Sequence, residues 1–221
     1  MKQLLSRALR AMALVILPLS LAGCGINAIP TKEETAKARF ADVQAQYQRR
    51  ADLIPNLVAT VQAYAQQERT VLTEVTQARA RATQVTIDPS KLTDPAAFQR
   101  FQSAQDGLSA SLGRLLAVSE RYPDLKSNQN FLALQSQLEG TENRIAIARR
   151  DYNDAVRDFN TPLRVFPTVF WAKTLYSSSK PMQPFQAAET AQTAPTVSFN
   201  LGGSPAAPAP APAPAPVPAS K

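Results

Sequence analysis

The sequence predicts an all-α protein, an antiparallel bundle of long heptad-patterned helices in which the first helix is very long and kinked. Apolar residues alternate at spacings of three and four over long stretches, which is the pattern of one buried helix face. No glycine occurs between Gly25 and Gly107, so the residue that most weakens helices, apart from proline, is absent there. Short connections separate the patterned stretches, and short connections favour antiparallel packing.

The first predicted helix covers residues 31–85. Continued through every seam position, its heptad register meets only two charged residues, Arg50 and Glu68. Pro55 lies in its middle and removes one backbone donor, which predicts a bend there rather than an end. The apolar seam consists of Phe40, Val43, Tyr47, Ile54, Leu57, Val61, Tyr64, Val71, Val75, Ala78, Ala82 and Val85.

Capping signals predict where each helix begins. Thr31-x-x-Glu34 has the spacing of a capping box at the start of the first helix. Asp94 followed by Pro95 predicts the start of a second helix, which runs to about residue 121. Ser127 or Asn128 can cap a third helix, which runs to about residue 160.

The second and third helices carry the same heptad pattern, and Gln105 interrupts the stripe of the second. The second helix is too short to cover more than about half of the first. The other half needs cover from the segment after the third helix, from another copy or from a membrane. The seam residues of the two helices are Phe98, Phe101, Leu108, Leu112 and Leu115, and Phe131, Leu134, Leu138, Thr141, Ile145, Ala148, Tyr152, Ala155 and Phe159.

Residues 161–171 are apolar and contain prolines, which predicts a short packing helix or hook. Phe166, Phe170 and Trp171 either join the core or touch a membrane. We place the bundle at residues 31–176. Residues 177–221 are expected to form a disordered tail that ends in alternating Ala and Pro, a composition that favours extended polyproline conformation.

The amino-terminal segment has the features of an export signal. Residues 1–23 combine a basic start with an apolar run of about a dozen residues, too short for the ~20 that a membrane-spanning helix needs. The sequence Leu21-Ala22-Gly23-Cys24 resembles the bacterial lipoprotein box, so Cys24 is the expected lipidation site and residues 24–30 a short tether. An ordinary cleavage site is the alternative. Gly25 follows the cysteine, which predicts sorting to the periplasmic face of the outer membrane in a Gram-negative host.

Composition excludes several kinds of chemistry. The chain has no histidine and one cysteine, so it lacks the imidazole of Ser-His-Asp catalysis and of His-liganded zinc sites. Without the leader, 21 basic residues face 17 acidic ones, and a net charge of +4 on an exported chain argues against nucleic-acid binding. We expect no cofactor, no metal and no catalytic residue.

Several motifs resemble the LemA family of bacterial envelope proteins. The most distinctive is Arg49-Arg50-Ala51-Asp52-Leu53-Ile54-Pro55-Asn56-Leu57, and the others are Glu74-Val75-Thr76-Gln77-Ala78-Arg79, Tyr122-Pro123-Asp124-Leu125, Gln137-Leu138-Glu139-Gly140-Thr141-Glu142-Asn143 and Ala148-Arg149-Arg150-Asp151-Tyr152-Asn153. The resemblance covers roughly residues 25–175. It implies a mostly helical extracytoplasmic domain with no established enzymatic activity. Many members begin with a transmembrane helix, whereas this chain has a lipoprotein box.

The distinctive run has two interpretations. Its charged residues, Arg49, Arg50 and Asp52, can pair with Glu139 or Glu142 across the bundle and set the helix register. Alternatively, the bend at Pro55 presents partner-binding residues, for which the candidates are Arg49, Asp52 and Asn56. Three acids, Glu139, Glu142 and Asp151, form a solvated or salt-bridged face more readily than a metal or acid-base site.

These observations favour a lipid-anchored envelope protein that acts as a non-catalytic interaction or scaffold protein. Its expected contacts are the membrane, through Cys24, and a second copy or a helical envelope protein. The alternative is an accessory subunit of an envelope hydrolase, or a hydrolase that uses carboxylates alone.

Overall fold

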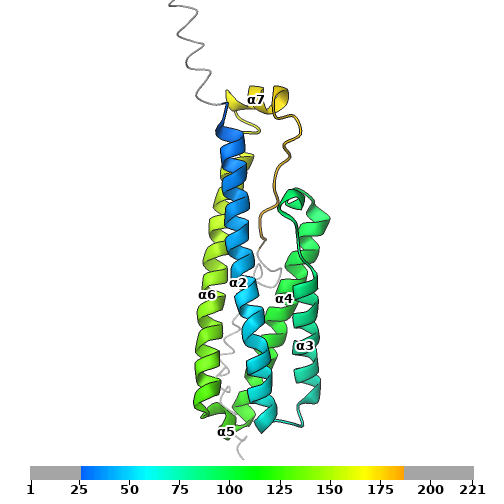
Figure 1. The fold of residues 1–221 in the computed structure, drawn as a ribbon, viewed down its shortest axis with the longest axis vertical. Helices are drawn as coiled ribbons and strands as arrows, with labels where there is room; N and C mark the ends of the chain where they lie inside the picture. Colours follow the sequence, from blue (N-terminus) through cyan, green and yellow to red (C-terminus); the bar gives the residue numbers. More distant parts are fainter. Residues whose placement is uncertain (1–25, 187–221) are drawn as a thin grey trace, which may run out of the picture. The chain divides into compact units, whose positions relative to one another are not determined.

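The computed structural model describes residues 26–186, and within this range it contains only helices and connections (Figure 1). Four long helices run in alternate directions, so the predicted all-α antiparallel bundle is confirmed. The longest pair, α2 and α6, pack along each other, and α3 packs against both α2 and α4. The long helices are α2 (Ala28–Tyr64), α3 (Arg69–Gln84), α4 (Pro95–Val118) and α6 (Gln129–Asn160); the short ones are η1 (Pro89–Lys91), η2 (Ser119–Arg121), α5 (Pro123–Lys126) and α7 (Thr168–Thr174).

The prediction of one helix over residues 31–85 is wrong in its extent. The helix α2 ends at Tyr64, and the chain reverses through residues 65–68 into α3. This turn contains neither glycine nor proline. Distant contacts stabilise it instead, because the carboxylate of Glu68 accepts a hydrogen bond from the Tyr122 hydroxyl at 3.1 Å and pairs with Arg121 at 3.1 Å. Local sequence therefore carries little signal for the turn.

The predicted helix starts have different outcomes. The Asp94 carboxylate accepts hydrogen bonds from the backbone N–H groups of Ala96 and Ala97, and Pro95 is the first residue of α4, as predicted. The Asn128 side chain caps α6 in the same way. The capping box at Thr31 is not used, because α2 already begins at Ala28.

The chain beyond α7 is not a tail from its first residue. Residues 177–185, which we call the return segment, run back along the bundle and bury Met182 and Phe185. Two asparagines of α6 bind their backbone: Asn153 exchanges two hydrogen bonds with Phe185, and Asn160 exchanges two with Met182, at 2.8–3.0 Å. The predicted boundary at residue 177 is therefore wrong. The remainder of the predicted tail, from residue 187, lies outside the described residues.

Two apolar cores follow one another along the bundle. The aromatic core lies toward α7, and the aliphatic core lies toward α5. The return segment completes the first of these, so the seam of α2 that needed cover is buried by its own chain. The aromatic core includes Phe40, Val43, Tyr47, Phe98, Phe101, Ile145, Tyr152, Phe159, Met182 and Phe185; the aliphatic core includes Ile54, Leu57, Val61, Leu72, Val75, Leu108, Leu112, Leu115, Leu125, Phe131 and Leu138.

Within residues 26–186, no helix combines the length and the apolar character needed to cross a membrane.

Candidate functional site

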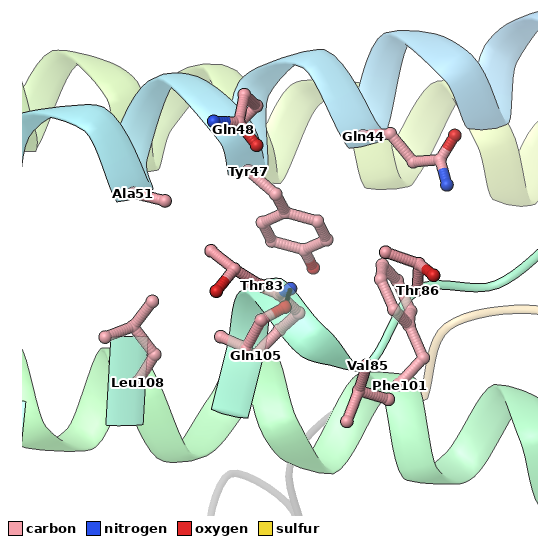
Figure 2. Close-up of a pocket in the computed structure, with 11 residues that line it drawn as sticks. Gln44, Tyr47, Gln48, Ala51, Thr83, Val85, Thr86, Phe101, Gln105 and Leu108 are labelled. Carbon is pink, nitrogen blue, oxygen red and sulfur yellow. Dashed lines mark hydrogen bonds between the residues drawn. The ribbon is translucent and has the colours of Figure 1, made fainter. Parts of the chain in front are cut away.

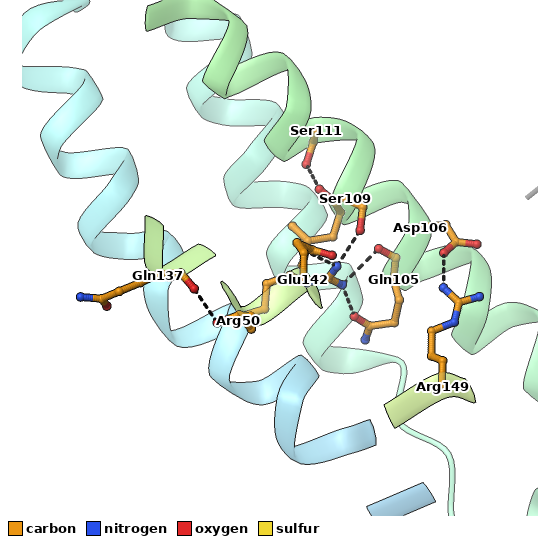
Figure 3. Close-up of polar contacts among 10 residues, drawn as sticks. Arg50, Gln105, Asp106, Ser109, Ser111, Gln137, Glu142 and Arg149 are labelled. Atoms are coloured by element: carbon orange, nitrogen blue, oxygen red, sulfur yellow. Dashed lines mark hydrogen bonds and ion pairs between the residues drawn. The ribbon is translucent and has the colours of Figure 1, made fainter. Parts of the chain in front are cut away.

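A buried polar layer separates the two cores. Arg50 of α2 is only 1% exposed, and its guanidinium donates hydrogen bonds to Ser109 Oγ at 2.6 Å and Glu142 Oε1 at 3.0 Å. It also donates to the side-chain oxygen of Gln105 at 2.7 Å and to the backbone carbonyl of the same residue at 3.2 Å. Figure 3 shows the guanidinium aimed into this group of acceptors. We call Arg50, Gln105, Ser109 and Glu142 the Arg50 layer.

The Arg50 layer connects all four long helices. Arg50 comes from α2, Gln105 and Ser109 come from α4, and Glu142 comes from α6. The amide of Gln105 then donates to the carbonyl of Ala82 in α3 at 3.0 Å. The predicted Arg50–Glu142 pair is thus confirmed. Gln105 interrupts an apolar stripe in the sequence. In the structure it links Arg50 to the backbone of α3.

One side of the Arg50 layer is open to water at Glu142, and the other side is covered by the ring of Tyr47. The Glu142 side chain is 40% exposed, so water reaches its carboxylate. The guanidinium lies over the Tyr47 ring with 5.0 Å between the guanidinium carbon and the ring centroid, and Nε of Arg50 has no hydrogen-bond partner within the described part of the chain. A buried cation with a charged partner, neutral acceptors and an aromatic face is well suited to fixing how helices align.

A second arginine compensates for the proline in α2. Pro55 lacks the N–H that would bond the carbonyl of Ala51 four residues earlier. Arg79 of α3 donates its Nε to that carbonyl at 2.8 Å. The helix continues through Pro55 to Tyr64, with this carbonyl satisfied from outside the helix. This role of Arg79 has no signal in the sequence, since only the reversal at residues 65–68 brings α3 beside Ala51.

The three candidate partner-binding residues lie on the outside of α2. Arg49, Asp52 and Asn56 are all exposed, and their spacing of three and four residues places them on one helix face. The Asp52 carboxylate accepts a hydrogen bond from Gln48 of the same helix at 2.8 Å. We call Arg49, Asp52 and Asn56 the polar ridge. Neither Arg49 nor Asp52 joins the Arg50 layer, so of these three charged residues only Arg50 forms the predicted pair across the bundle.

A cavity of about 100 Å³ lies beside the layer, between α2, α3 and α4 (Figure 2). The ring of Tyr47 points from α2 toward this cavity, and its buried hydroxyl has no partner among the described residues. Burial raises the pKa of Tyr47 above its ordinary value. The volume holds a few water molecules and is well below the ~300 Å³ of a typical small-molecule site.

The three acids considered for a metal or acid-base site have separate contacts. Glu142 binds Arg50, Glu139 accepts from Gln135 at 3.0 Å, and Asp151 lies 3.9 Å from Arg150. Residues 26–186 contain no group of three or more metal-ligating side chains that could hold an ion. The predicted lipoprotein box, Leu21, Ala22, Gly23 and Cys24, lies outside the described residues.

The fold and the layer define a class of protein, a long antiparallel helical bundle tied by a buried arginine. Within that class, the LemA family model matches residues 39–199, and the chain belongs to the LemA family. The chain is also similar to magnetosome protein MamQ of Magnetospirillum gryphiswaldense, with 26% identity over 157 residues, 64% of this chain and 58% of the relative. Two MamQ proteins of Paramagnetospirillum magneticum match with 26% identity over 161 residues and the same coverage. The chain thus spans less than two thirds of these relatives.

Proposed function

We propose that this protein is a lipid-anchored, extracytoplasmic interaction or scaffold protein of the bacterial cell envelope, without catalytic activity of its own. The observation that carries the proposal is the contrast between the two faces of α2 near Pro55. Its inner face is tied to three other helices through Arg50 and Arg79, while its outer face presents the polar ridge.

A fixed exposed helix face suits recognition. Binding costs less free energy when the surface is already ordered, because few side chains and no backbone must be immobilised. The two arginines hold the backbone of residues 50–56 through bonds to α3, α4 and α6. The ridge offers a cation, a carboxylate and an amide within two helical turns, which matches a polar helical surface of an envelope protein or of a second copy.

The anchoring part of the proposal depends on the single cysteine. Cys24 is the chain's only cysteine, and it closes a Leu-Ala-Gly-Cys box directly after an export signal. A diacylglyceryl group with an amino-terminal acyl chain buries many more methylenes than one myristoyl chain, so attachment is durable. In a Gram-negative host the protein would reside on the periplasmic face of the outer membrane.

Mass spectrometry of the mature amino terminus tests the anchor. The expected species begins at Cys24 and carries acyl groups, and the Cys24→Ala variant remains unprocessed at this site. A wild-type protein recovered in soluble form with an unmodified terminus contradicts lipidation.

Photo-crosslinking in intact cells tests the polar ridge. A photo-reactive amino acid at Asp52 is compared with one at Asp154, which is an exposed carboxylate on α6 with 52% of its side chain accessible. We expect a discrete adduct from Asp52 and none from Asp154. A second copy of the chain in the adduct identifies a homo-oligomeric scaffold, and another envelope protein identifies a hetero-complex. Equal adducts from both positions, or none from either, contradict a binding role for the ridge.

A further inference from the structure

Exposed apolar side chains gather at one end of the bundle. Of the seven large hydrophobic residues that are exposed within residues 26–186, four lie between residues 165 and 175. Phe166 is 86% exposed, and Leu175, Phe170 and Val165 are 59%, 56% and 47% exposed. We call these four residues the end patch. Isolated exposed hydrophobic residues need no explanation, but a group of this kind marks an interaction site.

The end patch is held in place rather than loosely attached. Ala172 on the other side of α7 is buried, and the half-buried Trp171 packs against the aromatic core. The Thr168 hydroxyl donates to the carbonyl of Pro162 at 2.9 Å, and the rings of Phe170 and Trp171 meet edge to face with 5.1 Å between centroids. The exposed aromatic rings are therefore presented by an anchored element.

The segment that carries the patch bears charge of one sign. The acidic residues at this end of the bundle, Glu33, Glu34 and Asp158, form ion pairs with Lys37 or Arg157 of their own helices. Residues 161–180 contain three basic side chains, Arg164, Lys173 and Lys180, and no acidic one. All three are exposed, and no salt bridge to them occurs within the described part of the chain. Aromatic residues mixed with lysine and arginine match the boundary between lipid headgroups and acyl chains, where rings enter the interface and cations meet phosphates. Two copies of the patch face to face would bring like charges together.

The patch also lies at the end of the bundle where the anchor would be attached. The helix α7 packs against the start of α2, where Ile29 and Ala172 share the aromatic core (Figure 1). Cys24 precedes Ala28 by four residues, and four residues of fully extended chain reach at most about 14 Å. A lipid on Cys24 would hold this end of the bundle within that distance of the membrane surface.

We infer that the end patch docks on the surface of an anionic phospholipid bilayer and forms a second membrane contact beside the lipid anchor. The orientation of this contact rests on the proposed anchor at Cys24, whereas the aromatic and basic composition of the patch does not. Docking through one end would make the bundle project from the membrane surface. The polar ridge would then lie at a defined distance from that surface.

The only tryptophan of the chain, Trp171, lies in α7 and reports on the patch directly. The protein is purified from detergent-extracted membranes and reconstituted into phosphatidylcholine vesicles with or without phosphatidylglycerol. Brominated phosphatidylcholine then quenches indole groups that reach the interface. We expect quenching of Trp171 of roughly twofold, deeper with phosphatidylglycerol. The Phe166→Ser/Phe170→Ser variant should lose most of it, and Leu132→Ser/Ile147→Ser, a pair of exposed apolar residues on α6, should retain it.

Mass spectrometry of the same preparation separates the two proposals. Acylated protein whose Trp171 is not quenched overturns the end patch and leaves the anchor intact. Unacylated protein whose Trp171 is quenched overturns the lipid anchor and supports docking of the end patch. Unacylated protein whose Trp171 is not quenched overturns the lipid anchor and the docking of the end patch. Emission that shifts with protein concentration in the absence of lipid assigns the patch to self-association and overturns membrane docking. Circular dichroism confirms that each variant remains helical.

Discussion

The two cores of the bundle are closed in different ways. The aliphatic core is surrounded by helices, because the 16-residue α3 covers that end of the 37-residue α2. The aromatic core lies beyond the end of α3, and the return segment and α7 fill the space. Aromatic side chains bury 150–250 Å² each, so a few large rings replace the contacts of a missing helix. The comparison shows that a short helix in a long bundle is compensated by larger side chains and by a distant segment.

Replacing one phenylalanine in each core compares them directly. Phe185→Ala and Phe131→Ala each remove a buried ring and should lower the free energy of unfolding by about 3–5 kcal/mol. Hydrogen exchange should differ between the two variants. Phe185→Ala should accelerate exchange in the first half of α2 and in the return segment, because that segment can open without unfolding the helices around α5. Equal acceleration along the whole of α2 in both variants would show that the cores open as one unit.

Removing Arg50 should disrupt the boundary between the cores. Arg50→Ala leaves a cavity and strands the buried side chain of Gln105, and we expect a loss of about 2–4 kcal/mol in equilibrium unfolding. The ion pair itself supplies little of this, because Glu142 is 40% exposed. Arg49→Ala, on the exposed side of the same turn, should change stability by less than about 0.5 kcal/mol. Equal losses from both variants would contradict the assigned roles.

The contact between Arg79 and Ala51 should depend on Pro55. Arg79→Ala removes the side-chain donor to this carbonyl, which Pro55 cannot serve, and should cost about 1–2 kcal/mol. Pro55→Ala restores a backbone donor four residues after Ala51, so Arg79→Ala in that background should cost less. A double-mutant cycle measures this coupling. Additive losses would mean that Arg79 stabilises the bundle through other contacts.

The smallest expected effect concerns alkaline pH. Burial raises the pKa of Tyr47, so the native state keeps its proton above pH 10 after the unfolded state has lost its own. The free energy of unfolding therefore falls as pH rises above about 10, by linkage. Burial also raises the pKa of Tyr152, which contributes a fall of the same sign, so Tyr47→Phe should reduce the fall without abolishing it. The variant should change stability little at neutral pH, because the Tyr47 hydroxyl lacks a partner within the described structure. Urea unfolding between about pH 9 and pH 11 measures the slope. An unchanged slope in the variant would rule out Tyr47 as its source.

The interruptions of the heptad pattern proved as informative as the pattern itself. Arg50 and Gln105 break the seams of two helices at the level where the cores meet, and Glu68 breaks the seam where the chain reverses. The helix period alone cannot separate one long helix from two, since α2 and α3 both pack on the same core. The contacts of Glu68 with Tyr122 and Arg121 stabilise the reversal that separates α2 from α3.

The return segment and the polar ridge were harder to assess from sequence. An extended segment has no helical period, and the asparagine side chains that bind it belong to α6. The exposed positions of Arg49, Asp52 and Asn56 follow from helix geometry once Arg50 is placed inside. Their proposed partner does not follow from any intramolecular contact, which is why the ridge needs an experiment in cells.

The central structural claim is that Arg50 and Gln105 act as one unit at the boundary of the cores, and a double-mutant cycle on this pair tests it most directly. Arg50→Met and Gln105→Leu are measured singly and together by equilibrium unfolding. Each single variant strands a buried polar partner, whereas the double variant replaces both by apolar groups. We therefore predict that the double variant is more stable than the sum of single losses implies, by about 1 kcal/mol or more. Additive losses would contradict the claim.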